Sequence, residues 1–150
     1  MDSKENIKNI NKDQIRSRSL KEMSQESLKI LKIIKFDENT KNMIFRELYE
    51  ALRQDIESIG YSKGYKFRSH EAITTFLKEI LKEYKLSILF DRYRLLRNKL
   101  NYYGKSINIE TVEEAIEKIP KIIKDLEKYR KWGTKNLHNF MKNYLRQQNV

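Results

Sequence analysis

Glycine and proline are scarce in this chain, and their scarcity is what most limits the folds that it can adopt. The 150 residues include four glycines, at positions 60, 64, 104 and 133, and one proline, Pro120. A sheet of many short strands needs such residues at its turns. Apolar residues recur at three- and four-residue steps, as on one face of a helix, and strand-like alternation is absent. The sequence therefore predicts an all-α fold, an antiparallel four-to-five-helix bundle with an extra C-terminal helix.

Six helices are predicted from the apolar periodicity and the capping residues. Their approximate ranges are 13–35, 40–59, 69–84, 87–104, 111–129 and 134–150. Ser69 is expected to cap the third helix, and Thr111 with Glu114 is expected to form a capping box for the fifth. Gly104 suits the left-handed position after the fourth helix. Residues 60–68 are expected to form a loop, and Pro120 to kink the fifth helix.

Each predicted helix has one apolar stripe that is expected to face the core. On the first four helices the stripes are Leu20, Met23, Leu28, Leu31 and Ile34; Phe45, Leu48, Leu52, Ile56 and Ile59; Ile73, Phe76, Leu77, Ile80 and Tyr84; and Leu89, Tyr93, Leu96, Leu100 and Tyr103. The chain is expected to comprise a flexible segment over residues 1–12, the bundle over 13–131 and a basic helix over 134–150.

The net charge of the chain favours negatively charged partners. The chain has 32 Lys+Arg against 21 Asp+Glu, for a formal charge of +11. Basic residues outnumber acidic ones by nine to five over residues 1–35, by fifteen to fourteen over 36–120 and by eight to two over 121–150. A basic excess attracts RNA, DNA or an acidic protein, although a compositional bias like that of a thermophile gives a similar total. Because the excess lies at the two ends, basic terminal helices are one candidate nucleic-acid interface.

Several classes of site are excluded or disfavoured by composition. The absence of cysteine excludes disulfides, thiolate metal ligands and a cysteine nucleophile, and two histidines make a histidine zinc site improbable. No apolar run approaches the ~18 residues that cross a bilayer, and the polar start does not resemble a signal peptide. A cytoplasmic protein without a metal, a cofactor or a membrane partner is the expectation.

The predicted fourth helix carries the most distinctive polar residues. At ~100° per residue, Arg97 lies about 80° from the centre of the core stripe, beside Arg94 and Asn101. A guanidinium at the core margin suits bidentate binding of a phosphate or carboxylate. Tyr103 is expected in the core, whereas Tyr102 lies ~140° from Arg97. One straight helix cannot bring Arg97 and Tyr102 together unless its end unwinds or a second protomer contributes its copy.

The polar residues of the predicted fourth helix, and the other candidate site residues, can also be explained by fold or solubility without any functional role. An arginine beside a core stripe is most often a surface residue whose charged end reaches solvent. The two tyrosines fit one core and one surface aromatic residue. His70 and His138 are expected to be structural or surface residues. The charged residues of the second helix are expected to form a solvated face, with a smaller chance of lining a site: Glu47, Glu50, Arg53 and Asp55.

Two stretches of the chain resemble HEPN domains of the archaeal type. Residues 48–53, LYEALR, and 64–72, GYKFRSHEA, resemble the second helix of that family and the loop that follows it. Residues 95–104, LLRNKLNYYG, resemble the family signature, in which an arginine and a polar residue are followed by a histidine. The resemblance covers about residues 13–130.

The resemblance implies an up-and-down bundle that usually dimerises, so that the signature residues of two protomers meet. Many HEPN proteins are metal-independent ribonucleases, often toxins; others are non-catalytic partners of a small nucleotidyltransferase, or bind nucleotides or RNA. The candidate catalytic residues are accordingly Arg97, Asn98 and Tyr102. The candidate ligand-binding residues are Arg94, Asn101, Tyr103, Arg53 and Glu50.

The chain departs from the signature at its most important position, because Tyr102 stands where the histidine is found. A phenol with an ordinary pKa of ~10 is a poor substitute for an imidazole as a base at pH 7. In some family members a tyrosine two residues after the histidine is modified with adenylate, and Gly104 occupies that place. The favoured hypothesis is a dimeric binding module for RNA or a nucleotide, or for a nucleotidyltransferase in a toxin–antitoxin-like pair. A ribonuclease using Arg97, Asn98 and Tyr102, and a binder acting through basic terminal helices, are the alternatives.

Overall fold

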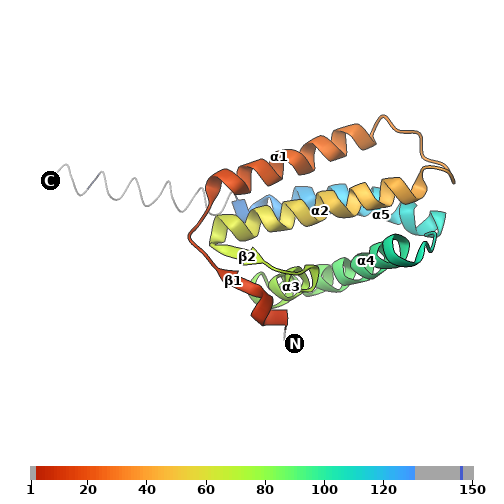
Figure 1. Cartoon of the computed structure of the whole chain (residues 1–150). Coiled ribbons are helices and arrows are strands. Elements are labelled where there is room, and N and C mark those ends of the chain that lie inside the picture. The colour runs from red at the N-terminus through yellow and green to blue at the C-terminus, as the bar shows by residue number, and fades with distance from the viewer. Residues whose placement is uncertain (1–2, 131–145, 147–150) are drawn as a thin grey trace.

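The computed structural model describes residues 3–130 and residue 146. Five α-helices make up most of this part of the chain (Figure 1): α1 (Gln14–Leu31), α2 (Lys41–Lys63), α3 (His70–Thr75), α4 (Tyr84–Tyr103) and α5 (Ile109–Leu126). A 3-10 turn (Ser3–Asn6), a π-helical turn (Phe76–Ile80) and two short strands, β1 (Ile7–Asn9) and β2 (Tyr65–Phe67), complete it. The predicted all-α class is confirmed. No helix in the described part of the chain is long and apolar enough to span a membrane.

Helix α2 is the central element of the bundle, and α1, α4 and α5 all pack against it. Its predicted stripe is confirmed, because each of its five residues is at most 2% exposed: Phe45, Leu48, Leu52, Ile56 and Ile59. Burial on several sides also removes the charged residue Asp55 from solvent, so the expected solvated face of this helix is wrong at that position. Apolar side chains of α3, α4 and α5 complete the same core.

Two serines set the contact between α1 and α2. The Ser17 hydroxyl donates to the Ser58 carbonyl oxygen at 2.7 Å, and the Ser24 hydroxyl donates to that of Ala51 at 2.8 Å. Both serines are buried, whereas Met23, which was expected in the stripe, is 50% exposed. Small side chains let the two helices approach closely, and the hydroxyls satisfy a second lone pair on α2 carbonyls. The longer apolar side chains of α1 therefore lie beside the line along which α1 contacts α2, and not on it.

Residues 60–68 do not form the predicted loop. Helix α2 continues through Gly60 and ends at Lys63, and Gly64 follows with a left-handed φ of 89°. A Cβ at position 60 would lie 2.7 Å from a ring carbon of Phe67. Gly60 therefore permits the close approach of β2 to the helix and does not break the helix.

Residues 6–10, within the segment that was expected to be flexible, are bound to β2 and its neighbours by backbone hydrogen bonds. Strand β1 pairs antiparallel with β2, with Ile7 opposite Phe67. The Arg68 amide donates to the Asn6 carbonyl at 2.8 Å, and the Ile10 amide donates to that of Gly64 at 2.9 Å. These strands were missed because each has three residues, too few for a visible alternation.

Two of the predicted helix ends are confirmed. The Ser69 side chain caps α3 by accepting a backbone N–H, and Gly104 follows α4 with a φ of 62°. Asp13 caps α1 in the same way as Ser69, which was not predicted. The predicted capping box is wrong, because α5 begins at Ile109, before Thr111. Glu114 instead contacts Arg92 and Lys118. Pro120 lies within α5, and the predicted helix over 134–150, with His138, lies outside the described residues apart from one position.

Candidate anion-binding site

Helix α4 is rotated relative to the prediction, and the rotation places Arg97 on its buried side. Phe90 stacks on Tyr49, with ring centroids 5.4 Å apart, and Tyr93 meets Phe45 edge to face at 5.5 Å. Tyr84 and Tyr103, which were expected in the core, are 55% and 75% exposed, and Leu89 and Leu96 are half-buried. The row that faces the core is made of every third or fourth residue: Phe90, Tyr93, Arg97 and Leu100. Pairing of bulky rings decides this rotation, and the apolar pattern of α4 alone is ambiguous.

Arg97 and five other side chains from three helices lie together at the junction of α2, α3 and α4. We call them the Arg97 cluster: Tyr49, Glu50 and Arg53 from α2, His70 from α3, and Arg94 and Arg97 from α4. The guanidinium carbon of Arg97 lies 5.0 Å from the centroid of the Tyr49 ring. The His70 ring lies 5.7 Å from the same ring at an interplanar angle of 16°. The Tyr49 ring is thus the platform on which the cluster is built.

His70 links the arginine to the tyrosine through one ring nitrogen. Its Nδ1 lies 2.9 Å from Nη2 of Arg97 and 2.5 Å from the hydroxyl of Tyr49. A guanidinium can only donate, so Nδ1 must be an acceptor and the ring proton must be on Nε2. The Tyr49 hydroxyl therefore also donates to Nδ1. The contacts fix one neutral tautomer of His70.

Burial keeps both His70 and Tyr49 uncharged, and for His70 the positive charges of the cluster act in the same direction. Burial, and after it the charges of Arg97 and Arg53, together lower the pKa of His70 to about 4. Burial raises the pKa of Tyr49 to about 12, although Arg97 acts against it. At neutral pH the imidazole is therefore an acceptor and the phenol a donor.

The arginines of the cluster differ in how their charge is balanced. Arg53 pairs with Glu50 and, at 2.6 Å, with Glu57. Arg94 lies 2.8 Å from Asp91 and 3.7 Å from Glu71. No carboxylate within residues 3–130 forms an ion pair with Arg97, and its buried Nε has no hydrogen-bond partner there. Arg97 is accordingly the cation of the cluster whose charge an added anion can neutralise.

The structure separates the predicted site residues into two groups. Arg94, Arg53 and Glu50 belong to the cluster with Arg97. The other four lie outside it: Asn98 is half-buried, Asn101 accepts a hydrogen bond from Nε of Arg46, and Tyr102 and Tyr103 are about three-quarters exposed. Within one protomer Tyr102 lies away from Arg97, which agrees with the angular separation expected on a straight helix.

Two members of the cluster were missed by the sequence interpretation, Tyr49 and His70. His70 was expected to be structural because it lies 27 residues before Arg97, outside the signature. It is the first residue after the Ser69 cap, and the packing of α3 against α4 is what brings it to Arg97. No pattern in the sequence predicts the contact between His70 and Arg97, because it depends on how α3 and α4 cross.

The titration of His70 provides a test of this geometry. We expect NMR to show an imidazole that stays neutral down to about pH 4, against 6.5 for an unperturbed histidine. In Arg97→Ala the pKa should rise but stay below 6.5, since burial remains. Because the unfolded chain takes up this proton at higher pH than the folded one, His70 should contribute a loss of stability between pH 6.5 and 4, measured as the difference between the wild type and His70→Asn. A His138→Gln variant assigns the signals, and a His70 pKa near 6.5 in the wild type would contradict the structure.

Comparisons of the chain with protein-family models, with curated proteins and with solved structures give no match. In the part of the chain that the structure describes, no three His, Cys, Asp or Glu side chains are grouped so that they could hold a metal ion. The chemistry of the site therefore has to be inferred from the cluster itself.

Proposed function

We propose that the chain is a HEPN-like helical module that binds RNA or a nucleotide through a phosphate group at Arg97. The observation that carries this proposal is the guanidinium of Arg97: it is half-buried, its carbon lies 5.0 Å from the centroid of the Tyr49 ring, and it has no carboxylate partner among the described residues. A planar guanidinium in a fixed orientation suits bidentate recognition of phosphate. Phosphate binding also agrees with the positive net charge, which favours polyanions.

Titration with AMP, adenosine and a short labelled single-stranded RNA tests this function. We expect AMP and the RNA to bind, with affinity that falls as salt is added, and adenosine to bind much more weakly because it lacks the phosphate. Equal binding of AMP and adenosine, or no binding of either phosphate ligand, would refute a phosphate site at Arg97.

A second candidate function is metal-independent cleavage of RNA, and the contact between Arg97 and His70 favours it. If Arg97 turns to a phosphodiester and the Tyr49 hydroxyl also turns away, the single lone pair of Nδ1 of His70 becomes available to a ribose 2′-hydroxyl. Nδ1 takes the proton of that hydroxyl, and the 2′-oxygen attacks phosphorus and expels the 5′-oxygen. The 5′-oxygen takes a proton from water, which leaves a 2′,3′-cyclic phosphate and a 5′-hydroxyl. His70 takes the part that the signature histidine plays in the family, but from α3 of the same chain. The low pKa of His70 makes it a weak base, so binding without cleavage is the preferred function.

Cleavage products decide between these two functions. A ribonuclease should give cyclic phosphate termini in EDTA, and Arg97→Ala and His70→Asn should each reduce the rate at least ~100-fold. Tyr102→Phe is the matched control and should cleave at the wild-type rate. Binding without any product supports the binding module.

Dimerisation is part of the proposal, and the outward face of α4 supports it. Four large apolar side chains follow this face, which we call the outer stripe: Tyr84, Ile88, Leu95 and Tyr102 are 55%, 72%, 46% and 73% exposed. Their spacing of four and seven residues places them in one row, as at a helix–helix interface. Leu95 lies ~160° from Arg97 around the helix, so pairing two outer stripes leaves each Arg97 cluster within its own protomer.

Charge reversal on the outer stripe should dissociate the dimer. Light scattering after size exclusion should give about twice the chain mass of 18.2 kDa for the wild type and one chain mass for Leu95→Glu. Ile33→Glu, at a residue that is 84% exposed outside α4, is the control and should remain dimeric. A monomeric wild type at high micromolar concentration would refute dimerisation. The same measurement with a co-expressed small nucleotidyltransferase tests the partner that the family resemblance implies.

A further inference from the structure

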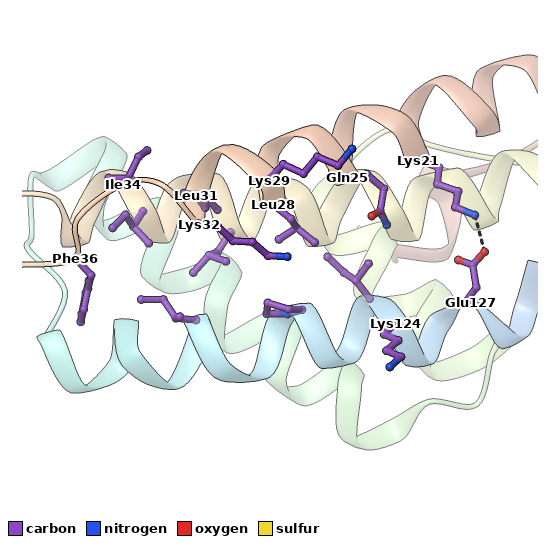
Figure 2. A pocket seen from close by; sticks show the side chains of 15 residues that line it. Lys21, Gln25, Leu28, Lys29, Leu31, Lys32, Ile34, Phe36, Lys124 and Glu127 are labelled. Atoms are coloured by element: carbon purple, nitrogen blue, oxygen red, sulfur yellow. Dashed lines mark hydrogen bonds and ion pairs between the residues drawn. The ribbon is translucent and has the colours of Figure 1, made fainter.

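An apolar groove of about 900 Å³ runs between α1 and α5, with α2 as its floor (Figure 2). It lies away from the Arg97 cluster, on another side of α2. Its apolar lining comes from α1, the segment after it, α2 and α5: Leu28, Leu31, Ile34, Phe36, Ile44, Leu48, Ile116, Pro120 and Ile123. Five of these, Leu28, Leu31, Ile34, Phe36 and Ile116, are half-buried although they pack against the core. The groove thus retains apolar surface that a further element can bury.

The groove exists because of the way α1 packs. The buried residues of α1 are Ser17 and Ser24, so its contact line on α2 is made of small polar side chains. Leu28 and Leu31 therefore face sideways toward α5. Both α1 and α5 pack on α2, and together the three helices leave a trough open along its length (Figure 2).

In the described part of the chain, four lysines line the groove. Lys21, Lys29 and Lys32 lie on the α1 side and Lys124 on the α5 side, against one carboxylate, that of Glu127. Lys21 pairs with Glu127 at one end, at 2.5 Å. Within residues 3–130 no carboxylate forms an ion pair with the other three lysines. From Lys21 to Lys32 the positive border extends roughly 16 Å along the helix.

This distribution of charge selects the occupant. A fatty acid has one carboxylate at one end and needs one basic group, whereas these lysines are spread along the groove. The basic segment after residue 130 and a second copy of this face would both meet charge of the same sign. An acidic helix with one apolar face has negative charges at intervals along its length and apolar side chains at the spacing that a helical groove accepts.

We propose that the groove between α1 and α5 binds an amphipathic acidic helix of a partner protein. Leucine-type side chains of that helix lie over Leu28 and Leu31, and its carboxylates meet Lys29, Lys32 and Lys124. The groove and the Arg97 cluster are separate, so the helix binds whether or not phosphate is bound.

An 18-residue peptide of leucine, alanine and glutamate, with leucines at helical spacing, is the probe. Its affinity for the full chain should fall at least ~10-fold in Lys29→Glu/Lys32→Glu and in Leu28→Asn. Lys78→Glu/Lys85→Glu makes the same change in net charge at exposed residues outside the groove and should alter the affinity less than ~3-fold. Arg97→Ala should bind the peptide like the wild type. Circular dichroism and thermal melts confirm that each variant is folded.

Other results identify other occupants and overturn the proposal. Equal weakening by both double variants, or equal binding of a scrambled peptide, means general attraction to a basic protein. Binding of palmitate in the groove without binding of the peptide means a site for a lipid chain. A gain in peptide affinity in Leu137→Asp/Phe140→Asp means that the C-terminal segment of the chain occupies the groove.

Discussion

Replacing Arg97 by alanine is expected to weaken binding of single-stranded RNA and of AMP by about 10- to 100-fold. Hydrogen bonds to charged groups contribute about 1.5–3 kcal/mol, and each 1.4 kcal/mol is a factor of ten in affinity. The loss should be large because the other two arginines of the cluster are already paired: Arg53 with Glu50 and Glu57, and Arg94 with Asp91. Fluorescence anisotropy with labelled RNA measures it, and Arg97→Lys should recover only part of the affinity, since lysine lacks the planar fork.

Arg92→Ala is the matched control for Arg97→Ala. Arg92 lies on the same helix, carries the same charge and pairs with Glu114 at the surface. Its removal should reduce affinity less than ~3-fold, because exposed charges contribute little and are screened. Similar losses in both variants would show that RNA binds to the basic protein in general and would remove Arg97 from the proposed function.

Replacing Arg130 by methionine is expected to lower the free energy of unfolding by about 3–5 kcal/mol, the usual cost of leaving a buried charge without its partner. Nη2 of Arg130 donates to Oδ1 of Asp55 at 2.7 Å and to the Ser58 hydroxyl at 3.0 Å. Asp55 is fully buried. Burial raises the pKa of Asp55 to about 6, and Arg130 acts against that rise. Without Arg130 the carboxylate of Asp55 is left in the core uncompensated.

The dependence of this effect on pH separates lost charge compensation from lost packing. Without Arg130 the pKa of Asp55 should rise further, so the folded variant holds a proton there that the unfolded chain has released. The destabilisation should therefore be smaller at pH 5 than at pH 8. Urea unfolding at both pH values measures it. Asp55→Asn/Arg130→Met should recover part of the stability, and Arg92→Met should cost less than about 1 kcal/mol. An equal loss at both pH values would mean that Arg130 acts by packing alone.

The elements with unambiguous patterns were predictable from the sequence. The stripe of α2 is correct at every position, and the predicted helix ends at Ser69 and Gly104 follow from local backbone chemistry. The wrong burial predictions lie on helices whose apolar pattern fits two different rotations of the helix against the core. Met23 and Tyr103 lie at the margins of apolar stripes, and a rotation of the helix by part of a turn exposes them.

The candidate site shows the same division. Four members of the cluster were predicted as site residues: Arg97, Arg94, Arg53 and Glu50. The position of a charged side chain relative to an apolar stripe can be read directly from the sequence. Tyr49 and His70 join them only through contacts between α2, α3 and α4. Asn98, Asn101, Tyr102 and Tyr103 follow the signature along the chain but lie outside the cluster.

The sequence by itself determined the class of fold, the starts of α1, α2 and α3, the end of α4 and the arginine at the centre of the candidate site. These depend on interactions within a few residues: periodicity, capping and the absence of turn residues. The tertiary structure decided the rotation of α4, the pairing of β1 with β2, the histidine beside Arg97 and the lysine-bordered groove between α1 and α5. Each of these is a contact between segments far apart in the chain. Side-chain volume and shape choose such contacts, and no local pattern records them.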